Sequence, residues 1–241
     1  MGPNVDFWSR ELNSAGISTF ALDGLTGRGL TSVTGDQASL GRLNLILDSY
    51  RALEILAGHP RVDPSRVALM GFSRGGQAAL YASLTRFHQM WNRSGIQFAA
   101  YVPFYPNCST TYHADTAMAD VPIRIFLDTA DDVNPVHPCR AYVKRLTTAG
   151  RDVVLTENDN AHHVFDVPTL SATPVVVTGE TGAWCTIREE ASGRLINAGT
   201  AQPFTYGDAC VRRSFHYAYD QEATESAKRS VIEFLADLFE L

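Results

Sequence analysis

The chain has 241 residues, of which 45% are hydrophobic and 19% are charged, and its formal net charge is −6. This length allows one large domain with a substantial core, and the composition is that of an ordinary globular protein. The acidic balance argues against nucleic acid or an anionic membrane surface as the main partner. No apolar run approaches the ~20 residues that span a bilayer, and the sequence lacks the basic segment and apolar run of a signal peptide.

Short apolar runs alternate with amphipathic segments along most of the chain. This alternation is typical of the α/β class, in which a mostly parallel sheet is covered by helices on both faces. A Thr34-x-x-Gln37 capping box predicts the start of one helix, and Gly58 and Pro60 predict its end. The predicted strands are 17–22, 66–72, 98–102, 123–127 and 152–155, and the other predicted helices are 8–15, the segment after the 66–72 strand, and the segments around 139–146 and 231–238.

Residues 166–221 interrupt the alternation, because they are rich in Thr, Gly, Ser and Pro. Within them, 183–187 and 194–198 read as the two strands of a hairpin that turns at Ser192-Gly193. We expect this region to be an insertion or cap near the active-site face of a single domain that covers residues 1–241.

A serine lies in a sharp glycine-flanked turn between a predicted strand and a predicted helix. Ser73 belongs to the segment 71–76, GFSRGG, which follows the apolar run 67–70 and precedes a stretch of small residues. In such a turn the residues two before and two after the serine must be small, and the serine oxygen is exposed at the top of the sheet. The first amides of the next helix help to stabilise negative charge there. The pattern predicts that Ser73 is a nucleophile.

Two later loops offer partners for this serine. A serine hydroxyl becomes a nucleophile when a base takes its proton, and a third group must orient that base. Residues 128–135 follow one predicted strand and contain Asp131 and Asp132, and residues 160–166 follow another and contain His162 and His163. The order Ser, Asp, His along the chain is that of α/β-hydrolases and differs from that of the two best-known serine-protease folds.

Together, segments 71–76, 131–135 and 161–166 resemble the dienelactone-hydrolase-like branch of the α/β-hydrolase family, and the resemblance extends from the segment after Trp8 to the last helix. The family pattern places the acid four residues before a proline and the base two residues before a phenylalanine. It therefore implies Asp131 as the acid and His163 as the base, with Asp132 and His162 as ordinary loop residues. The implied activity is hydrolysis of a small carboxylic ester or lactone through an acyl-enzyme, with no cofactor and no metal.

Two departures limit what the resemblance implies. The namesake enzymes use a cysteine nucleophile where this chain has Ser73, so their particular lactone is not carried over. Relatives often have His-Gly where this chain has Leu127-Asp128. A peptidase of the same fold and a non-catalytic binding protein of the same fold are the alternatives, and the sequence leaves the oligomeric state open.

The family also implies where the oxyanion is held. One donor is the backbone N–H after the nucleophile, which is that of Arg74, and the other comes from the loop after the third strand of the fold. The predicted strand 17–22 corresponds to the family's fourth strand. We therefore expect that the first strands are missing from this chain and that the second donor is missing with them.

Other candidate residues are Arg28 and Tyr105, which could contact substrate; the alternative for Arg28 is a salt bridge that holds its loop. The four cysteines, Cys108, Cys139, Cys185 and Cys210, fit no metal-binding spacing and are compatible with two disulfides or with four buried thiols. A Cys108–Cys139 pair would join two neighbouring strand ends, and a Cys185–Cys210 pair would staple the insertion. Disulfides and relatives that carry these cysteines favour a periplasmic or secreted location over a cytoplasmic one.

Overall fold

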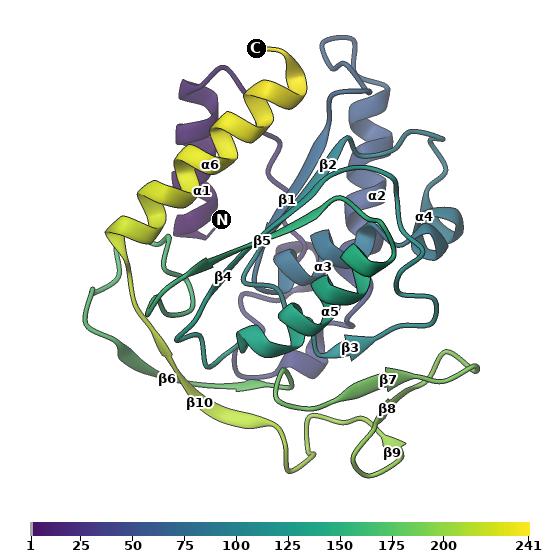
Figure 1. The fold of residues 1–241 in the computed structure, drawn as a ribbon, viewed down its shortest axis with the longest axis vertical. Coiled ribbons are helices and arrows are strands. Elements are labelled where there is room, and N and C mark those ends of the chain that lie inside the picture. The colour runs from purple at the N-terminus through teal and green to yellow at the C-terminus, as the bar shows by residue number, and fades with distance from the viewer. Residues whose placement is uncertain (1) are drawn as a thin grey trace.

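The computed structural model describes residues 2–241, and its centre is a four-stranded parallel sheet (Figure 1). The strand order is β1-β2-β4-β5. In register, Ala68 lies opposite Ala100 and Ile123 lies opposite Val153. The strands are β1 (Ala68–Phe72), β2 (Ala100–Phe104), β4 (Ile123–Asp128) and β5 (Val153–Asn158). The predicted α/β class with a parallel sheet is confirmed.

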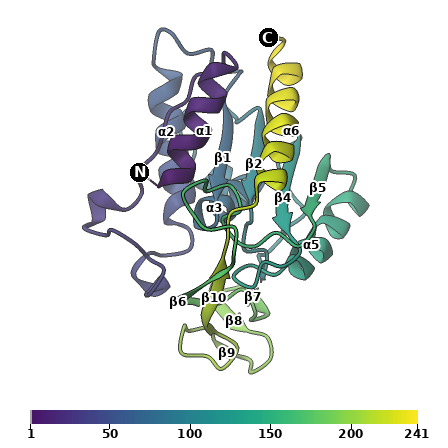
Figure 2. The ribbon, with the colours of Figure 1, turned by 90° about the vertical axis from the view of Figure 1, so that its left-hand side faces the viewer.

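Helices cover both faces of this sheet, as Figures 1 and 2 show. α1 (Pro3–Ser14) and α6 (Gln221–Phe239) lie side by side on one face, where Lys228 of α6 is 3.3 Å from Glu11 of α1. The other helices are α2 (Asn44–Ala57), α3 (Arg74–Ala82), α4 (Thr85–Trp91) and α5 (Val136–Thr148), with short 3₁₀ turns at Thr26–Arg28 and Gln37–Ser39. None of the helices in residues 2–241 is long and apolar enough to cross a membrane.

β2 is a continuous apolar run because both of its faces are buried in the core. All five of its residues are buried, because it lies between β1 and β4 with helices on both sides. Trp8 of α1 packs its indole against the rings of Phe72 and Phe104 at centroid distances of 6.3 and 4.9 Å. The N-terminal helix is therefore part of the same core as β1, the strand that directly precedes Ser73.

Two sequence predictions were wrong. Residues 17–22 are extended but form no strand, and the side chains of Phe20 and Leu22 are 54% and 45% exposed. A strand needs a hydrogen-bonding neighbour, and in the described part of the chain this segment has none. The capping box at Thr34 also starts no α-helix, since α2 begins at Asn44; the Gln37 side chain and N–H donate instead to Glu180, at 2.7 and 2.8 Å.

Residues 175–217 form strands that lie outside the central sheet. β6 (Val175–Thr181) pairs antiparallel with β10 (Arg212–Tyr217). β7 (Ile187–Glu189) and β8 (Leu195–Asn197) form the predicted hairpin; β7 begins where the first predicted strand ends, and β8 lies within the predicted 194–198. Two further short strands, β3 (Thr110–Thr111) and β9 (Gln202–Pro203), complete a small sheet of order β3-β7-β8-β9.

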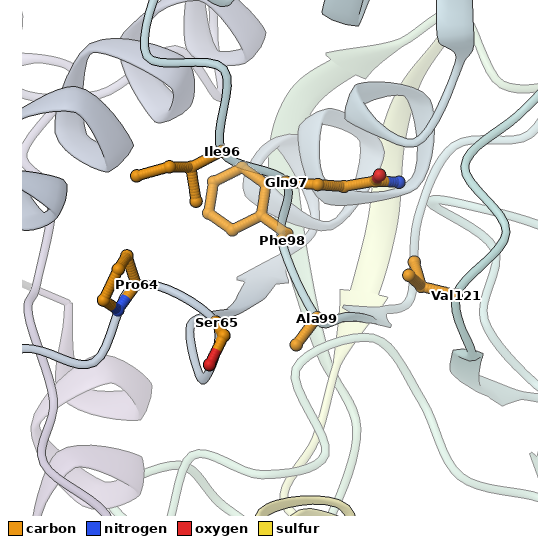
Figure 3. Close-up of a pocket in the computed structure, with 7 residues that line it drawn as sticks. All are labelled: Pro64, Ser65, Ile96, Gln97, Phe98, Ala99 and Val121. Carbon is orange, nitrogen blue, oxygen red and sulfur yellow. The ribbon is translucent and has the colours of Figure 1, made fainter.

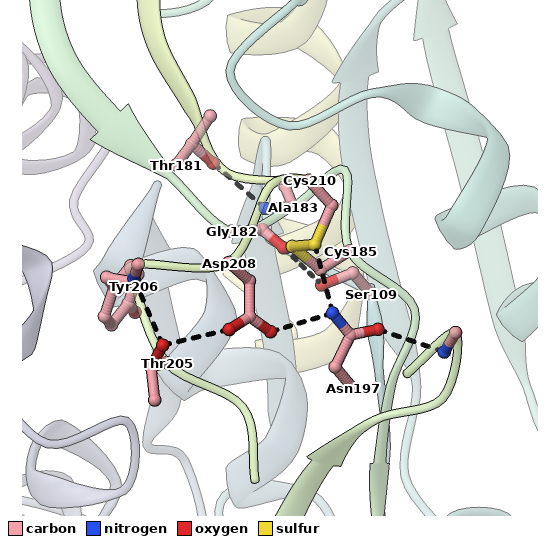
Figure 4. The surroundings of a disulfide bond; sticks show 12 residues. Ser109, Thr181, Gly182, Ala183, Cys185, Asn197, Thr205, Tyr206, Asp208 and Cys210 are labelled. Atoms are coloured by element: carbon pink, nitrogen blue, oxygen red, sulfur yellow. Dashed lines mark hydrogen bonds between the residues drawn. A yellow bond between two sulfur atoms is a disulfide. The ribbon is translucent and has the colours of Figure 1, made fainter. Parts of the chain in front are cut away.

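Both predicted disulfides are present, so the alternative of four free thiols is wrong. Cys108 bonds to Cys139 and Cys185 bonds to Cys210, and the Cα–Cα distances are 5.0 and 5.1 Å. The second bond joins the chain after β6 to the chain before β10 (Figure 4). The Asn197 amide of β8 donates to Cys210 Sγ at 3.4 Å and to Asp208 at 2.7 Å, so β8 is tied to the disulfide as well.

Candidate active site

Ser73 occupies the turn between β1 and α3 in a conformation that few residues adopt. Its φ is 51° and its ψ is −110°, and it is the residue immediately before the first turn of α3. Its N–H donates to the Phe104 carbonyl of β2 at 3.0 Å, and its own carbonyl accepts from the Gln77 N–H at 2.8 Å. The neighbouring elements therefore hold the backbone in a strained state that aims the hydroxyl away from the sheet.

Two glycines make this turn possible, Gly71 and Gly76, whereas the motif predicts Gly71 and Gly75. A Cβ at Gly71 would lie 2.2 Å from the Gly75 carbonyl oxygen, so this position must be glycine, as predicted. A Cβ at Gly75 would meet no atom within 4 Å. The second confined position is Gly76, where a Cβ would lie 2.2 Å from the Phe104 carbonyl oxygen. The position after the serine that must be glycine is therefore Gly76, three residues later, where α3 crosses β2.

His163 and Asp131 complete a chain of hydrogen bonds from Ser73. Nε2 of His163 lies 3.0 Å from Oγ of Ser73, and Nδ1 lies 2.7 Å from Oδ2 of Asp131. The other carboxylate oxygen of Asp131 accepts the N–H groups of Val133 and Asn134, each at 2.8 Å. Both His163 and Asp131 are buried, with 1% and 4% of their surfaces exposed. The structure thus brings together the three side chains that the sequence singled out.

The neighbouring residues, Asp132 and His162, lie elsewhere. Asp132 accepts the backbone N–H of His216 at 2.8 Å and is paired with Nδ1 of its ring at 2.8 Å. Its backbone carbonyl accepts the Trp184 indole N–H at 2.8 Å. His162 has no hydrogen bond to Ser73 or Asp131, and its ring lies 6.1 Å from that of His216. Of the two aspartates and two histidines in these loops, Asp131 and His163 are the ones that share the hydrogen-bond chain to Ser73.

Two weaker candidates are placed in structural roles. Arg28 makes a bidentate ion pair with Asp48 at 2.7 and 2.8 Å and donates to the Gly24 carbonyl, so it has the loop-holding contacts of the alternative interpretation. Tyr105 is fully buried and has no exposed surface with which to line a pocket. Its ring packs edge-on against His163 at a centroid distance of 4.7 Å.

Arg74 is the first residue of α3, so its N–H belongs to the helix end where amides have no intrahelical acceptor. Its guanidinium turns away to the Leu40 carbonyl and to the Tyr206 hydroxyl, the latter at 3.2 Å. Burial lowers the pKa of this guanidinium. The side chain therefore serves packing, while the backbone N–H stays next to Ser73.

Sequence reasoning missed three residues near Ser73, His163 and Asp131: Asn134 and Tyr217 contact members of this triad, and Asp166 contacts Tyr105, which packs on His163. Asn134 donates its side-chain amide to the Tyr105 carbonyl at 2.8 Å. Tyr217 of β10 pairs as an isolated parallel bridge with His163 and stacks near its ring at 5.5 Å. Asp166 accepts from Tyr105 and Trp8. Asn134 and Asp166 lie within the two loop motifs, which was the available signal; nothing local in the sequence relates Tyr217 to His163.

Asp128, at the end of β4, is a buried acid close to Asp131. Burial and the charge of Asp131 raise its pKa well above the usual value for an aspartate. One oxygen accepts from the Asn158 amide at 3.0 Å, and the other has no partner in residues 2–241. This is where relatives often have His-Gly, and here the position carries a carboxyl that burial drives toward its neutral form.

Two surface depressions have no lining residue in the Ser73 turn or in the loops of Asp131 and His163. One, with a volume of about 410 Å³, is lined by Pro64, Ser65, Ile96, Gln97, Phe98, Ala99 and Val121 (Figure 3). Most of these residues precede β1 or β2 and so lie at the opposite end of the strands from Ser73; open α/β sheets hold ligands at the carboxyl ends of their strands. Within residues 2–241, no group of three or more His, Cys, Asp or Glu side chains is arranged to hold a metal ion.

Comparison with solved structures shows the fold. The chain is similar to a dienelactone hydrolase-like promiscuous phosphotriesterase from metagenomic libraries, with 18% identity over 98% of this chain and 81% of that one and a TM-score of 0.60. It also matches an α/β hydrolase from a Medee basin deep-sea metagenome, with 15% identity over 81% and 65% of the chains and a TM-score of 0.48. An esterase from Thermogutta terrifontis matches with 20% identity over 52% and 57% and a TM-score of 0.44.

The chain thus spans 65% of the length of the Medee basin hydrolase and 57% of the length of the Thermogutta terrifontis esterase. A search of curated proteins found no match. A family model described as the dienelactone hydrolase family matches residues 34–239, which include the Ser73 turn, both partner loops and all of α6. Because this match covers most of the sequence, the protein is a member of the dienelactone hydrolase family.

Proposed function

We propose that the protein is a serine hydrolase that cleaves a small carboxylic ester or lactone. The observation that carries this proposal is the unbroken hydrogen-bond chain from Ser73 Oγ through His163 to Asp131, with links of 3.0 and 2.7 Å. A serine, an imidazole and a carboxylate in that order are the parts of a nucleophilic acyl-transfer site. Membership of the dienelactone hydrolase family supports the same reaction class.

In the first half of the reaction, Ser73 Oγ forms a bond to the substrate carbonyl carbon while His163 Nε2 accepts the hydroxyl proton. Asp131 holds the Nδ1–H of the imidazole and stabilises the imidazolium that forms. The two backbone N–H groups that donate to the other Asp131 oxygen fix the orientation of this carboxylate. The tetrahedral intermediate collapses as the C–O bond to the alcohol breaks, and His163 returns the proton to the leaving oxygen.

In the second half, water attacks the acyl-enzyme and gives its proton to His163, and Ser73 leaves with that proton as the acid is released. The Arg74 N–H at the start of α3 is one donor for the oxyanion, and the helix end adds a favourable partial charge. The substrate in this proposal is a small ester or lactone, and no cofactor enters the steps.

Two disulfides support a periplasmic or secreted location, because such bonds form and persist in oxidising compartments.

The test uses p-nitrophenyl acetate turnover and fluorophosphonate labelling of the protein, with Ser73→Ala as the control. We expect turnover and labelling in the wild type and neither in Ser73→Ala, while circular dichroism shows that the variant is folded. Labelling that survives Ser73→Ala would refute the nucleophile assignment. A folded wild type that neither turns over nor labels would favour a non-catalytic member of the fold.

A further inference from the structure

Asp166 is a buried carboxylate close to the proposed general base, and the steps above do not use it. It lies three residues after His163 and has no exposed surface. Tyr105 Oη donates to one of its oxygens at 2.7 Å, and Trp8 Nε1 donates to the other at 2.7 Å. Both donors are neutral, so the described residues that bind Asp166 supply no cation. A buried carboxylate whose hydrogen-bond donors are all neutral costs stability, so a role in the site would account for its presence.

Tyr105 connects Asp166 to His163. The phenol that donates to Asp166 belongs to the ring that packs edge-on against the imidazole, with centroids 4.7 Å apart. Asn4 of α1 donates to the same hydroxyl at 3.2 Å. The ring is therefore fixed at its hydroxyl end by Asp166 and Asn4, and it restricts His163 with its body.

The backbone of Tyr105 is held just as firmly and is strained. Its φ is 33°, a value that non-glycine residues rarely adopt. Its N–H donates to the Phe126 carbonyl at 2.7 Å, and its carbonyl accepts from the Asn134 side chain at 2.8 Å. Asn134 in turn donates its N–H to Asp131. Strained residues persist where the surroundings over-determine them, and here the strain lies beside Ser73 and Val164, whose φ values of 51° and 60° are also positive.

We propose that Asp166 is a positioning residue for His163, which it orients through the Tyr105 ring and whose imidazolium it favours through its own negative charge. This inference rests on the proposed function, since it assigns His163 as the base. It also gives α1 a part in the site, because Trp8 and Asn4 hold the carboxylate and the phenol in place.

The charges around Asp166 set the direction of the effect. Burial raises the pKa of Asp166, and the hydrogen bonds from Tyr105 and Trp8 and the charge of His163 oppose that rise. By reciprocity, an ionised Asp166 favours the protonated His163. The other titratable groups near this network are Asp131 and the phenol of Tyr217 beside His163, the phenol of Tyr105 and the carboxyl of Asp128, with Asp220 at the start of α6 acting on Asp128.

Three variants separate orientation from charge. Asp166→Asn removes the charge, Tyr105→Phe removes only the hydroxyl that links the ring to Asp166, and Asp159→Asn removes a charge from an exposed position of the same loop as a matched control. The measurements are the rate of fluorophosphonate labelling, the pH profile of kcat/KM for p-nitrophenyl acetate, and the NMR titration of the His163 imidazole. Thermal unfolding reports whether each variant is folded.

We expect Asp166→Asn to label about 10-fold more slowly or worse, and its acid limb and imidazole titration to move to lower pH by about 0.5 unit or more. Tyr105→Phe should slow labelling to a similar extent and leave the titration in place, because the charge remains. A folded Asp166→Asn that matches Asp159→Asn in labelling rate and titration would overturn the proposal, as would a Tyr105→Phe with the wild-type labelling rate. If Asp166→Asn does not fold, Tyr105→Phe still decides.

Failure of the proposed function gives a different result. In that case the wild type itself neither labels nor turns over substrate, yet the imidazole titration can still be measured. A shift of that titration in Asp166→Asn and not in Asp159→Asn would then support the coupling of Asp166 to His163, and equal titrations would refute it.

Discussion

The two glycines after Ser73 respond in opposite ways to the same substitution. Gly75→Ala adds a Cβ that meets no atom within 4 Å, at the second residue of α3. Alanine is favoured over glycine within a helix by about 1 kcal/mol, so this variant should be as stable as the wild type or more stable. Gly76→Ala places its Cβ 2.2 Å from the Phe104 carbonyl oxygen.

The clash at Gly76 can be relieved only by moving backbone. Carbon–oxygen contacts lie at about 3.3 Å or more, so α3 and β2 must separate by roughly 1 Å. Phe104 O is also the acceptor of the Ser73 N–H, so the same movement weakens the bond that holds the serine turn. Overpacking costs about 1–3 kcal/mol and a lost hydrogen bond about 1 kcal/mol, so after the helix-propensity gain of about 1 kcal/mol we expect a net loss of about 1–3 kcal/mol.

Urea denaturation followed by circular dichroism measures both variants against the wild type, and fluorophosphonate labelling reports on the turn. Gly76→Ala should be less stable than Gly75→Ala by about 3 kcal/mol and should label more slowly. If the two variants unfold at the same urea concentration with equal m-values, the crossing of α3 over β2 is not the constraint that the geometry indicates.

Three further results follow from individual contacts. Arg28→Ala should lower the free energy of unfolding by less than about 1 kcal/mol, since its pair with Asp48 is partly exposed, and it should leave kcat/KM unchanged for neutral and anionic esters alike; a selective loss on the anionic ester would show a substrate contact instead. The double variant C185S/C210S opens a link between residues 25 apart, so urea denaturation should show a loss of about 3 kcal/mol, and an unchanged midpoint would contradict this. Asp220→Ala removes the side chain that accepts the Ala223 N–H at the start of α6, and thermal unfolding should show a loss of about 1 kcal/mol; Asp220→Asn, which keeps a capping oxygen, should lose much less.

Local patterns in the sequence were enough to predict the elements that carry the site. The apolar runs before Ser73, Asp131 and His163 are strands or strand ends, because buried parallel strands are continuous in sequence and present their following loops at one edge. The preference for Asp131 over Asp132 as the acid came from a family resemblance and stays a prediction; in the structure Asp132 is paired with His216, and Asp131 with His163.

Features that depend on distant partners could not be predicted in this way. Residues 17–22 have a strand-like composition, yet strand formation needs a neighbour that composition does not reveal. Thr34 and Gln37 have capping-box spacing, but Gln37 binds Glu180, which lies far along the chain. The placement of Tyr217 on His163 is likewise set by how β10 docks on the loops, and no local pattern encodes docking.

The contacts of β10 also bear on the order in which the parts of the candidate site are made during synthesis. Asp132 is held by His216, and His163 is bridged by Tyr217, so the loops that bear the acid and the base are finished by residues made much later. At usual translation rates the ribosome needs roughly 3 to 10 seconds to pass from His163 to Tyr217. A nascent chain therefore contains Ser73, Asp131 and His163 before it contains the strand whose residues contact Asp132 and His163.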